Sequence, residues 1–317
     1  MTEIAFIKTS SLGDVIHNMP ALTDARRAFP HARFTWVVEE AYVPLVRLHP
    51  DVDEVVPVAA RRWRHAPFSS GTWKEVRGFS RKLREHPFDA VIDTQGLLKT
   101  GLITRLAPGP RHGYDSDSIR EPVASRFYDV RHQVSRAEHA VTRNRTLTGL
   151  ALGYTPPDAL DYGLRREILL NGGVSTRSAV LFHGTARAEK QWPEERWVSL
   201  GQMLSKQGFE VLLPWGTEDE RARSARMAAQ VQNSRVLDRT TLDVTARYIA
   251  AASFVVGVDT GLLHLAAALS VPLVAIFTAT EPGLTGPLGP GPLAVVGGKG
   301  RVPSVDEVLS ALPGSTQ

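Results

Sequence analysis

Short apolar runs alternate with stretches of helical periodicity through the first half of the chain. Apolar runs of four to six residues with no polar alternation are typical of strands that are buried on both faces. They predict strands over residues 4–7, 33–38, 55–58 and 90–93, with helices over 15–29, 40–48, 72–85, 97–106 and 135–152. Strands separated by helices predict parallel βαβ units.

The pattern stops around Tyr154-Thr-Pro-Pro-Asp158, where the proline pair indicates a linker. A second alternating set follows, with strands over 179–182, 209–213, 254–258 and 272–277, and helices over 193–207, 218–231, 242–252 and 262–269. A capping box, Ser304 with Glu307, starts a final helix over 304–312. We therefore expect an α/β protein of two doubly wound domains, 1–158 and 159–317, with the final helix a candidate to pack back onto the first domain.

The composition is that of a soluble globular protein, and 317 residues suit two domains. The chain has no cysteine, which excludes disulfides, thiolate metal sites and cysteine nucleophiles. The N-terminus lacks the pattern of a secretory signal, and no apolar stretch is long enough for a membrane span. We expect a cytoplasmic protein.

The net charge of +4 is unevenly distributed. Residues 1–160 contain 22 Lys and Arg against 18 Asp and Glu, whereas residues 161–317 contain 15 of each. Between Arg61 and Arg84, eight basic residues face a single acidic one, Glu75. Such a segment indicates an anionic partner such as phosphate, nucleic acid or a membrane surface, or else a solvated helix face.

The loop Lys8-Thr-Ser-Ser-Leu-Gly-Asp14 follows the first strand and leads into a helix. Ligands of open α/β sheets bind just beyond the carboxyl ends of strands. The loop has one glycine, so it matches neither a dinucleotide fingerprint nor a P-loop. Asp14 could act as the general base of a sugar-transfer reaction or could simply cap the helix, and the loop alone leaves both interpretations open.

Three loops of the second domain, 183–193, 214–220 and 257–264, follow strands and should line a cleft between the domains. Gly257-Val-Asp-Thr-Gly261 begins a helix, so Thr260 and Gly261 could bind a phosphate, with His264 one turn further on. Capping of this helix by Asp259 and Thr260 is the alternative. Lys190 could reach a diphosphate, and Glu220 could bind a ribose, although a surface lysine and a helix-stabilising glutamate are the ordinary interpretations. No residue cluster has metal-ligand spacing.

Eight motifs occur in a fixed order: Lys8-Thr-Ser-Ser-Leu-Gly-Asp-Val-Ile-His, Trp36-Val-Val-Glu-Glu, Arg61-Arg-Trp-Arg, Asp93-Thr-Gln-Gly-Leu-Leu-Lys, Arg120-Glu-Pro, Lys190-Gln-Trp-Pro-Glu-Glu, Pro214-Trp-Gly and Val258-Asp-Thr-Gly-Leu-Leu-His. Together the motifs make the chain similar to the lipopolysaccharide heptosyltransferases of glycosyltransferase family 9. The resemblance extends from Ile4 to about Pro290. It implies a GT-B fold, in which two Rossmann-like domains face each other across the active site.

The resemblance also implies an activity. It implies inverting transfer of L-glycero-D-manno-heptose from ADP-heptose to the first Kdo of Kdo2-lipid A, with no cofactor and no metal. By motif position, Asp14 matches the general base. The donor would be bound by Thr185, Lys190, Glu220, Asp259, Thr260, Gly261 and His264, and the acceptor by Ser10, Arg61, Arg64, Lys99 and Arg120. The second domain would thus bind the donor and the first domain the acceptor.

One residue departs from the family pattern, because Ala186 stands where members often carry a second threonine. Two other functions remain open: addition of the second heptose by the same chemistry, and closure on an anionic sugar without catalysis. Nucleic-acid binding is a weaker interpretation, because the chain lacks a recognisable module and interleaved aromatic residues. We expect a monomer on the cytoplasmic face of the bacterial inner membrane, with no transmembrane segment and no nucleic-acid partner.

Overall fold

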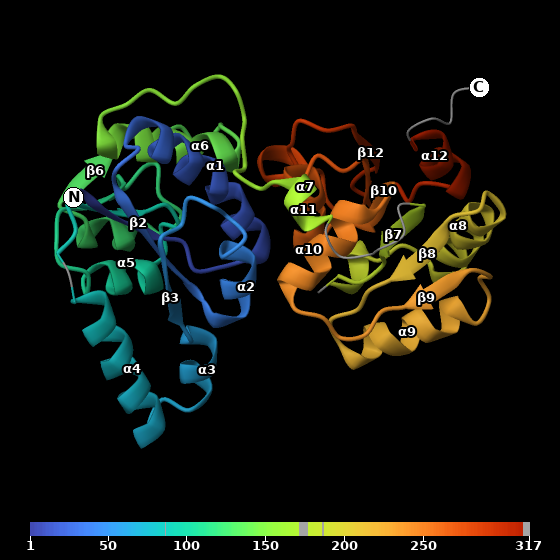
Figure 1. Cartoon of the computed structure of the whole chain (residues 1–317), viewed down its shortest axis with the longest axis horizontal. Helices are drawn as coiled ribbons and strands as arrows, with labels where there is room; N and C mark the ends of the chain where they lie inside the picture. The colour runs from blue at the N-terminus through green and yellow to red at the C-terminus, as the bar shows by residue number, and fades with distance from the viewer. Residues whose placement is uncertain (86, 171–176, 186, 313–317) are drawn as a thin grey trace. The chain divides into compact units, whose positions relative to one another are not determined.

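The computed structural model describes residues 1–85, 87–170, 177–185 and 187–312. The chain divides into two compact units, Met1–Gly163 and Leu164–Gln317. In the described residues, each unit is built on a six-stranded parallel sheet (Figure 1). None of the helices in these ranges combines the length and apolar character needed to cross a membrane.

The sheet of the first unit has the strand order β3-β2-β1-β4-β5-β6. Its strands are β1 (Glu3–Ile7), β2 (Arg33–Glu39), β3 (Glu54–Val58), β4 (Ala90–Asp93), β5 (Arg111–Tyr114) and β6 (Val130–His132). The helices are α1 (Leu12–Ala28), α2 (Val43–Val46), α3 (Ala60–His65), α4 (Ser70–Leu83), α5 (Leu98–Thr104) and α6 (Ala140–Leu152), with 3-10 turns η1 (Glu40–Tyr42) and η2 (Pro122–Phe127).

Helices cover both faces of this sheet, which explains why its central strands are continuous apolar runs. The helices α1 and α6 pack together on one face. On the other face, Phe79 and Leu83 of α4 and Ile103 of α5 pack against side chains of the central strands, among them Ile7 and Val91. All four residues of β4 are buried. The burial of the strands on both faces holds their carboxyl ends, and the loops that follow, in fixed positions.

The second unit repeats the architecture with the strand order β12-β11-β10-β7-β8-β9. Its strands are β7 (Ser178–Phe182), β8 (Glu210–Leu213), β9 (Ser234–Val236), β10 (Phe254–Val258), β11 (Leu273–Phe277) and β12 (Leu293–Gly297). The helices are α7 (Arg166–Leu169), α8 (Glu194–Lys206), α9 (Glu218–Ala228), α10 (Leu242–Ala251), α11 (Gly261–Ala268) and α12 (Val305–Ser310), with 3-10 turns η3 (Ala188–Lys190) and η4 (Gly283–Thr285).

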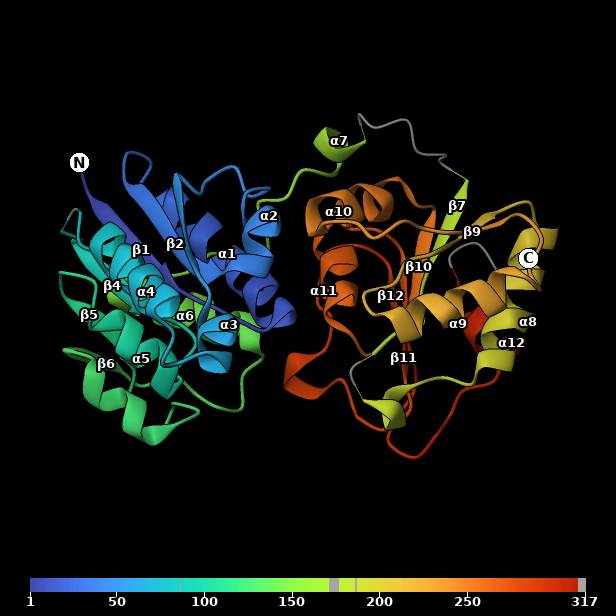
Figure 2. The ribbon, with the colours of Figure 1, turned by 90° about the horizontal axis from the view of Figure 1, so that it is seen from below.

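The core of the second unit is centred on two tryptophans. Trp192 and Trp197 are fully buried and meet edge to face with ring centroids 5.0 Å apart. The helices α8, α9 and α12 lie together on this face of the sheet, whereas α10 and α11 lie on the other (Figure 2). Val308 of α12 is fully buried in the same core, so the final helix packs within the second unit.

Candidate functional site

Both sheets reverse their strand order at one place, which is where α/β proteins of this type bind ligands. In the first unit the reversal lies between β1 and β4, and in the second it lies between β7 and β10. In such sheets the connections leave to opposite sides at the reversal, and a crevice opens between the two loops. The loops that begin at Lys8 and Thr94 follow β1 and β4, and the loops that begin at His183 and Asp259 follow β7 and β10.

Asp14 occupies the first turn of α1, immediately after the loop that follows β1. Its Oδ2 accepts a hydrogen bond from the backbone N–H of Ser11 at 2.7 Å and another from the Ser11 hydroxyl at 3.0 Å. The capping role considered from the sequence is therefore present. No described residue donates a hydrogen bond to the other oxygen, Oδ1, and the residue is partly exposed. That second oxygen can accept a proton from a substrate hydroxyl.

The side chain of Gln95 holds the loop that leads to Asp14. Its Oε1 accepts hydrogen bonds from the backbone N–H groups of Thr9 at 2.7 Å and Ser10 at 3.1 Å, and from the Thr9 hydroxyl at 3.1 Å. Its Nε2 donates to the Ser10 carbonyl. Lys99 Nζ donates to Ser10 Oγ at 2.7 Å. Gln95 and Lys99, which lie in the turn after β4 and in the first turn of α5, thus fix the backbone and the hydroxyl of Ser10.

Two buried charged residues, Lys8 and Asp93, stabilise these loops by hydrogen bonds. Lys8 Nζ donates to the Thr94 carbonyl at 2.8 Å and to Asn144 Oδ1 at 3.3 Å, and burial lowers the pKa of Lys8. Asp93 is fully buried, and its carboxylate accepts bonds from the backbone of the 95–96 turn and from the Tyr128 hydroxyl. Burial raises the pKa of Asp93 against those hydrogen bonds. The sequence contained Lys8, Asp93 and Gln95 within its motifs, but it assigned none of them a role.

Four of the predicted acceptor-binding side chains are basic. Burial lowers the pKa of Lys99, and the neighbouring positive charges of Arg61 and Arg64 act in the same direction, so the three lie near one another. Arg61 donates to the Tyr42 hydroxyl at 3.0 Å, whereas Arg64 is exposed at the end of α3. Arg120 is exposed on the loop after β5. Lys99 contacts Ser10, and the three arginines are exposed, so these basic side chains can bind anionic groups.

In the second unit, Asp259 brings together residues from three loops. Lys190 Nζ lies 2.6 Å from Asp259 Oδ2, and the Thr280 hydroxyl donates to the same oxygen at 2.9 Å. The Thr185 hydroxyl donates to the Asp259 carbonyl at 3.2 Å. Thr280 was not predicted, since a threonine after β11 has no distinguishing signal in the sequence. Lys190, Thr185 and Asp259 were predicted separately, and the structure joins them.

Glu220 caps α9 and lies against the β7 loop. Its Oε2 accepts hydrogen bonds from the N–H groups of Gly216 at 2.7 Å and Thr217 at 3.2 Å. A Cβ on Gly184 would lie 2.2 Å from Glu220 Oε1, so only glycine allows this close approach. Glu220 therefore belongs to the same region of the second unit as the 183–190 loop.

The start of α11 completes this second group. Thr260 is the N-cap residue, Gly261 opens the helix, and His264 is buried one turn further on. The Thr260 side chain makes no capping hydrogen bond, so the first N–H groups of α11 remain available to an anion. Ala186 lies outside the described residues. Within the ranges that the structure describes, no group of three or more His, Asp or Glu residues could hold a metal ion.

Two Rossmann-like units in one chain, each with a polar group of residues at its switch point, are the architecture of GT-B glycosyltransferases. A lysine and a helix start in one unit suit a nucleotide diphosphate, and a carboxylate with basic neighbours in the other suits an anionic acceptor. The chain belongs to glycosyltransferase family 9, the heptosyltransferase family, whose model matches residues 76–311.

Curated relatives support the assignment over most of the chain. Lipopolysaccharide heptosyltransferase 1 of Pseudomonas aeruginosa is 46% identical over 288 residues, which cover 90% of this chain and 81% of the relative. The enzyme of the same name from Escherichia coli is 44% identical over 289 residues, covering 90% and 91%. Lipopolysaccharide heptosyltransferase 2 of E. coli is less similar, at 35% over 310 residues.

Solved structures agree with this placement. The E. coli heptosyltransferase WaaC with ADP superposes with a TM-score of 0.92 at 41% identity, covering 97% of this chain and 98% of that one. The same enzyme with ADP-2-deoxy-2-fluoro heptose gives a TM-score of 0.88 at 41% identity, covering 95% of both chains. These matches establish the GT-B fold and the class of enzyme.

Proposed function

We propose that this chain transfers L-glycero-D-manno-heptose from ADP-heptose to the first Kdo of Kdo2-lipid A, with inversion at the anomeric carbon. The observation that carries the proposal is the likeness, over nearly the whole chain, to heptosyltransferase 1 and to the ADP-bound structure of heptosyltransferase WaaC. The second-heptose alternative is disfavoured by the lower identity to heptosyltransferase 2. Membership of a glycosyltransferase family disfavours a protein that only binds sugars.

Asp14 is the group that activates the acceptor in this proposal. A sugar hydroxyl is a weak nucleophile at neutral pH, so a carboxylate must take its proton as the oxygen attacks the anomeric carbon. Attack opposite the departing ADP inverts the configuration through a transition state with oxocarbenium-ion character. The proton passes from the Kdo hydroxyl to Asp14 Oδ1, while Oδ2 stays in its hydrogen bonds to Ser11.

The second unit stabilises the leaving group. Negative charge grows on the diphosphate as the glycosidic bond breaks, and positioned donors lower the energy of that state. Lys190, the Thr185 hydroxyl and the free N–H groups at the start of α11 supply such donors. Lys190 rests against Asp259 in this structure, and a diphosphate would share or replace that partner. We propose that these groups suffice without a metal ion.

The basic residues of the first unit would bind the acceptor. Lys99 already donates to Ser10, and Arg61, Arg64 and Arg120 add positive charge around the loop that carries Asp14. Kdo and the phosphorylated lipid are both anionic, so this charge suits the acceptor. We further propose that the enzyme works as a monomer at the cytoplasmic face of the inner membrane, where such a lipid is embedded.

The activity assay incubates the purified chain with ADP-heptose and heptose-free Kdo2-lipid A, and it measures released ADP and the product mass. One added heptose is the expected result, and an EDTA arm should retain the activity within about twofold. Addition only to an acceptor that already bears one heptose would favour the second-heptose enzyme. Ligand binding without ADP release from any acceptor would favour a binding protein.

The base is tested by Asp14→Asn, since the amide keeps an oxygen that can accept the Ser11 hydrogen bonds and cap α1. We expect turnover to fall by about 10²–10⁴-fold, with ADP affinity unchanged. The matched control is Glu307→Gln, because Glu307 makes the same kind of cap with Ser304 on α12. Near-normal turnover of Asp14→Asn would refute the assignment of Asp14 as the base.

A further inference from the structure

The helices α3 and α4 form a hairpin that extends away from the sheet of the first unit (Figure 1). The loop that joins them carries Phe68, and Trp73 lies in the first turn of α4. Phe68 is 94% exposed and Trp73 is 55% exposed. Two large aromatic side chains in water at one end of a projecting hairpin have no role in the core of this unit.

A basic stripe runs along α4 from Trp73. We define this stripe as Arg77, Arg81 and Arg84, which follow Trp73 at spacings of three or four residues and therefore share one helix face. The opposite face carries Phe79 and Leu83 into the core. The three arginines, Ser80 and Glu85 line a shallow hollow on the surface. Trp73 and the basic stripe therefore share one outer face of α4, and the exposed Phe68 precedes the helix in the loop.

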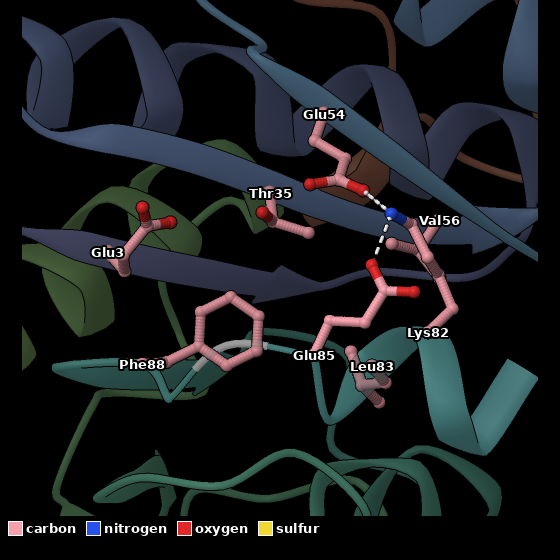
Figure 3. Close-up of a pocket in the computed structure, with 8 residues that line it drawn as sticks. All are labelled: Glu3, Thr35, Glu54, Val56, Lys82, Leu83, Glu85 and Phe88. Atoms are coloured by element: carbon pink, nitrogen blue, oxygen red, sulfur yellow. Dashed lines mark hydrogen bonds and ion pairs between the residues drawn. The ribbon is translucent and has the colours of Figure 1, made fainter.

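The charges on the inner flank of the hairpin are already neutralised. Lys82 lies between Glu54 and Glu85, with Nζ 2.8 and 2.7 Å from their oxygens (Figure 3). Arg62 is likewise paired with Glu40 and Glu75. These ion pairs hold the hairpin against β3 and within itself, so the inner basic residues have structural partners.

The basic stripe differs from the inner flank. None of its three arginines forms an ion pair with a carboxylate in the part of the chain that the structure describes, and the Arg84 side chain donates only to the Leu106 carbonyl, at 3.3 Å. Unpaired arginines in a row repel one another and attract anions. Their separation from the paired flank therefore indicates an external anionic partner for this side of α4.

We propose that the outer surface of the α3–α4 hairpin docks on an anionic lipid bilayer, with Phe68 and Trp73 inserted among the head groups and the basic stripe against lipid phosphates. Aromatic side chains partition into the interfacial region, and each nearby Lys or Arg adds attraction to anionic lipids. The inference deepens the proposed function, on which it partly rests, because it specifies the surface that meets the membrane of a lipid-linked acceptor.

The arrangement favours a bilayer over other anionic partners. The aromatic side chains gather at one end of the hairpin, whereas single-stranded nucleic acid is bound by aromatic residues interleaved with basic ones. An apolar end beside a charged stripe matches a surface whose anionic layer borders hydrocarbon. Arg61 and Arg64, the proposed acceptor contacts, lie on the α3 arm of the same hairpin. Docking would therefore bring the proposed acceptor residues near the lipid head groups.

Vesicle sedimentation tests the docking surface without any substrate. The probe is vesicles of phosphatidylcholine with about one-third phosphatidylglycerol, compared with pure phosphatidylcholine. We expect binding to the anionic vesicles that weakens as salt rises. Replacing the basic stripe by glutamine (R77Q/R81Q/R84Q) should weaken it about 100-fold. The matched control is K206Q/R239Q/R247Q, three exposed basic residues of the second unit, and it should bind like the wild type.

Fluorescence tests the aromatic tip. Trp36, Trp192 and Trp197 are buried, and Trp63 and Trp215 are partly buried, so most of the quenching by brominated lipids should come from Trp73, which is 55% exposed. We expect the wild type to be quenched and W73F to lose the quenching while still binding. The double variant F68S/W73S should bind about tenfold more weakly, whereas L150S, which removes an exposed leucine from α6, should not.

Activity with two acceptors separates this inference from the proposed function. The basic-stripe variant should keep normal turnover on a water-soluble, lipid-free Kdo acceptor and lose turnover on the acceptor embedded in vesicles. Wild-type protein that binds vesicles but turns over neither acceptor would refute the proposed heptosyl transfer and would still support the proposed docking surface. Three results would overturn the proposed docking surface. They are wild-type binding by R77Q/R81Q/R84Q, equal binding of the protein to neutral vesicles, and binding of nucleic acid in place of vesicles at physiological salt.

Discussion

Gln95 is not itself a predicted substrate contact, and replacing it should lower turnover by releasing Ser10 and the loop that leads to Asp14. Its carboxamide makes four hydrogen bonds to Thr9 and Ser10, residues that lie 86 and 85 positions earlier in the chain. Thr9 is 1% exposed and Ser10 is 6% exposed, so water cannot readily replace these bonds. The loop they hold leads directly into α1 and Asp14. We expect Gln95→Leu to release this loop.

The size of the effect follows from the groups left without partners. A buried N–H that loses its acceptor costs about 1–3 kcal/mol, and Gln95→Leu strips two of them, so the loop conformation is destabilised by about 2–4 kcal/mol if it partly relaxes. A displacement of about 1 Å at a catalytic group lowers the rate about 100-fold. Gln95→Glu keeps the acceptor oxygen but loses the donor to the Ser10 carbonyl, so we expect an intermediate loss of about tenfold.

The assay is steady-state turnover at saturating acceptor, together with the KM for ADP-heptose. We expect kcat to fall in the order wild type, Gln95→Glu, Gln95→Leu, with the donor KM unchanged, because the donor-binding loops belong to the second unit. The matched control is Gln202→Leu, which removes an exposed glutamine with one hydrogen bond to the Gln230 carbonyl. Wild-type kcat in Gln95→Leu would refute the positioning role, as would a loss confined to KM.

Two further perturbations address the second unit. Lys190→Met should weaken ADP binding about 10–100-fold by calorimetry, because a charged hydrogen bond to phosphate is lost, and unchanged affinity beside a Lys206→Met control would contradict this. Burial lowers the pKa of His183 to about 4, so the neutral ring stabilises the fold above pH 6.5, and about 3 kcal/mol is lost as the pH falls from 6.5 through 4. Urea unfolding at both ends of that window should show this loss of unfolding free energy in the wild type and not in His183→Gln. An equal dependence of the unfolding free energy on pH in the two proteins would contradict the prediction.

The sequence predicted the central strands and the edge strand β3, but it missed β5, β6, β9 and β12, which lie at or next to the other sheet edges. The runs over 4–7 and 90–93 became β1 and β4, because strands covered on both faces must be apolar throughout. The strands β5, β6 and β9 escaped notice, because short strands such as Arg111–Tyr114 are mostly polar. The strand β12 follows a segment rich in Gly and Pro, which reads as loop. Partial exposure near a sheet edge removes the hydrophobic signal.

The helices show the same dependence on local signals. The Ser304 and Glu307 pair predicted the start of α12 correctly, because a capping box is a contact within one turn. The start of α6 was placed at Ser135, whereas the helix begins at Ala140 with His139 as its N-cap. The short helix α3 was not predicted, and its basic residues were described only as part of a charged segment.

The residues of the candidate site were predictable where a charged side chain follows a buried strand. They were missed where an uncharged side chain positions a residue that is distant in sequence. Asp14 and Asp259 stand out because carboxylates after buried strands are conspicuous. Gln95 and Thr280 carry no distinguishing chemistry, and each reaches its partner across a large separation in sequence. The pairing of Lys190 with Asp259 joins residues 69 positions apart. Such contacts arise from the strand order of the sheet, which periodicity alone does not reveal.

The sequence set two interpretations of Asp14 and Glu220 against each other, a helix cap and a functional carboxylate. The structure shows that the two interpretations are compatible. Asp14 accepts its capping bonds through Oδ2 and Glu220 through Oε2. In the described residues, nothing donates a hydrogen bond to their other oxygens. Asp259 likewise uses Oδ2 for both Lys190 and Thr280.

Asp14 and Glu220 are each held through one oxygen at the start of a helix that follows a parallel strand, and the other oxygen of each accepts no hydrogen bond from the described residues. The cap therefore positions the functional oxygen, since a fixed side chain loses little entropy when it meets a substrate. Substitution by alanine removes the cap and the free oxygen together and confounds the two roles. The amides Asp14→Asn and Glu220→Gln keep an accepting oxygen for the cap, so they test the second oxygen alone.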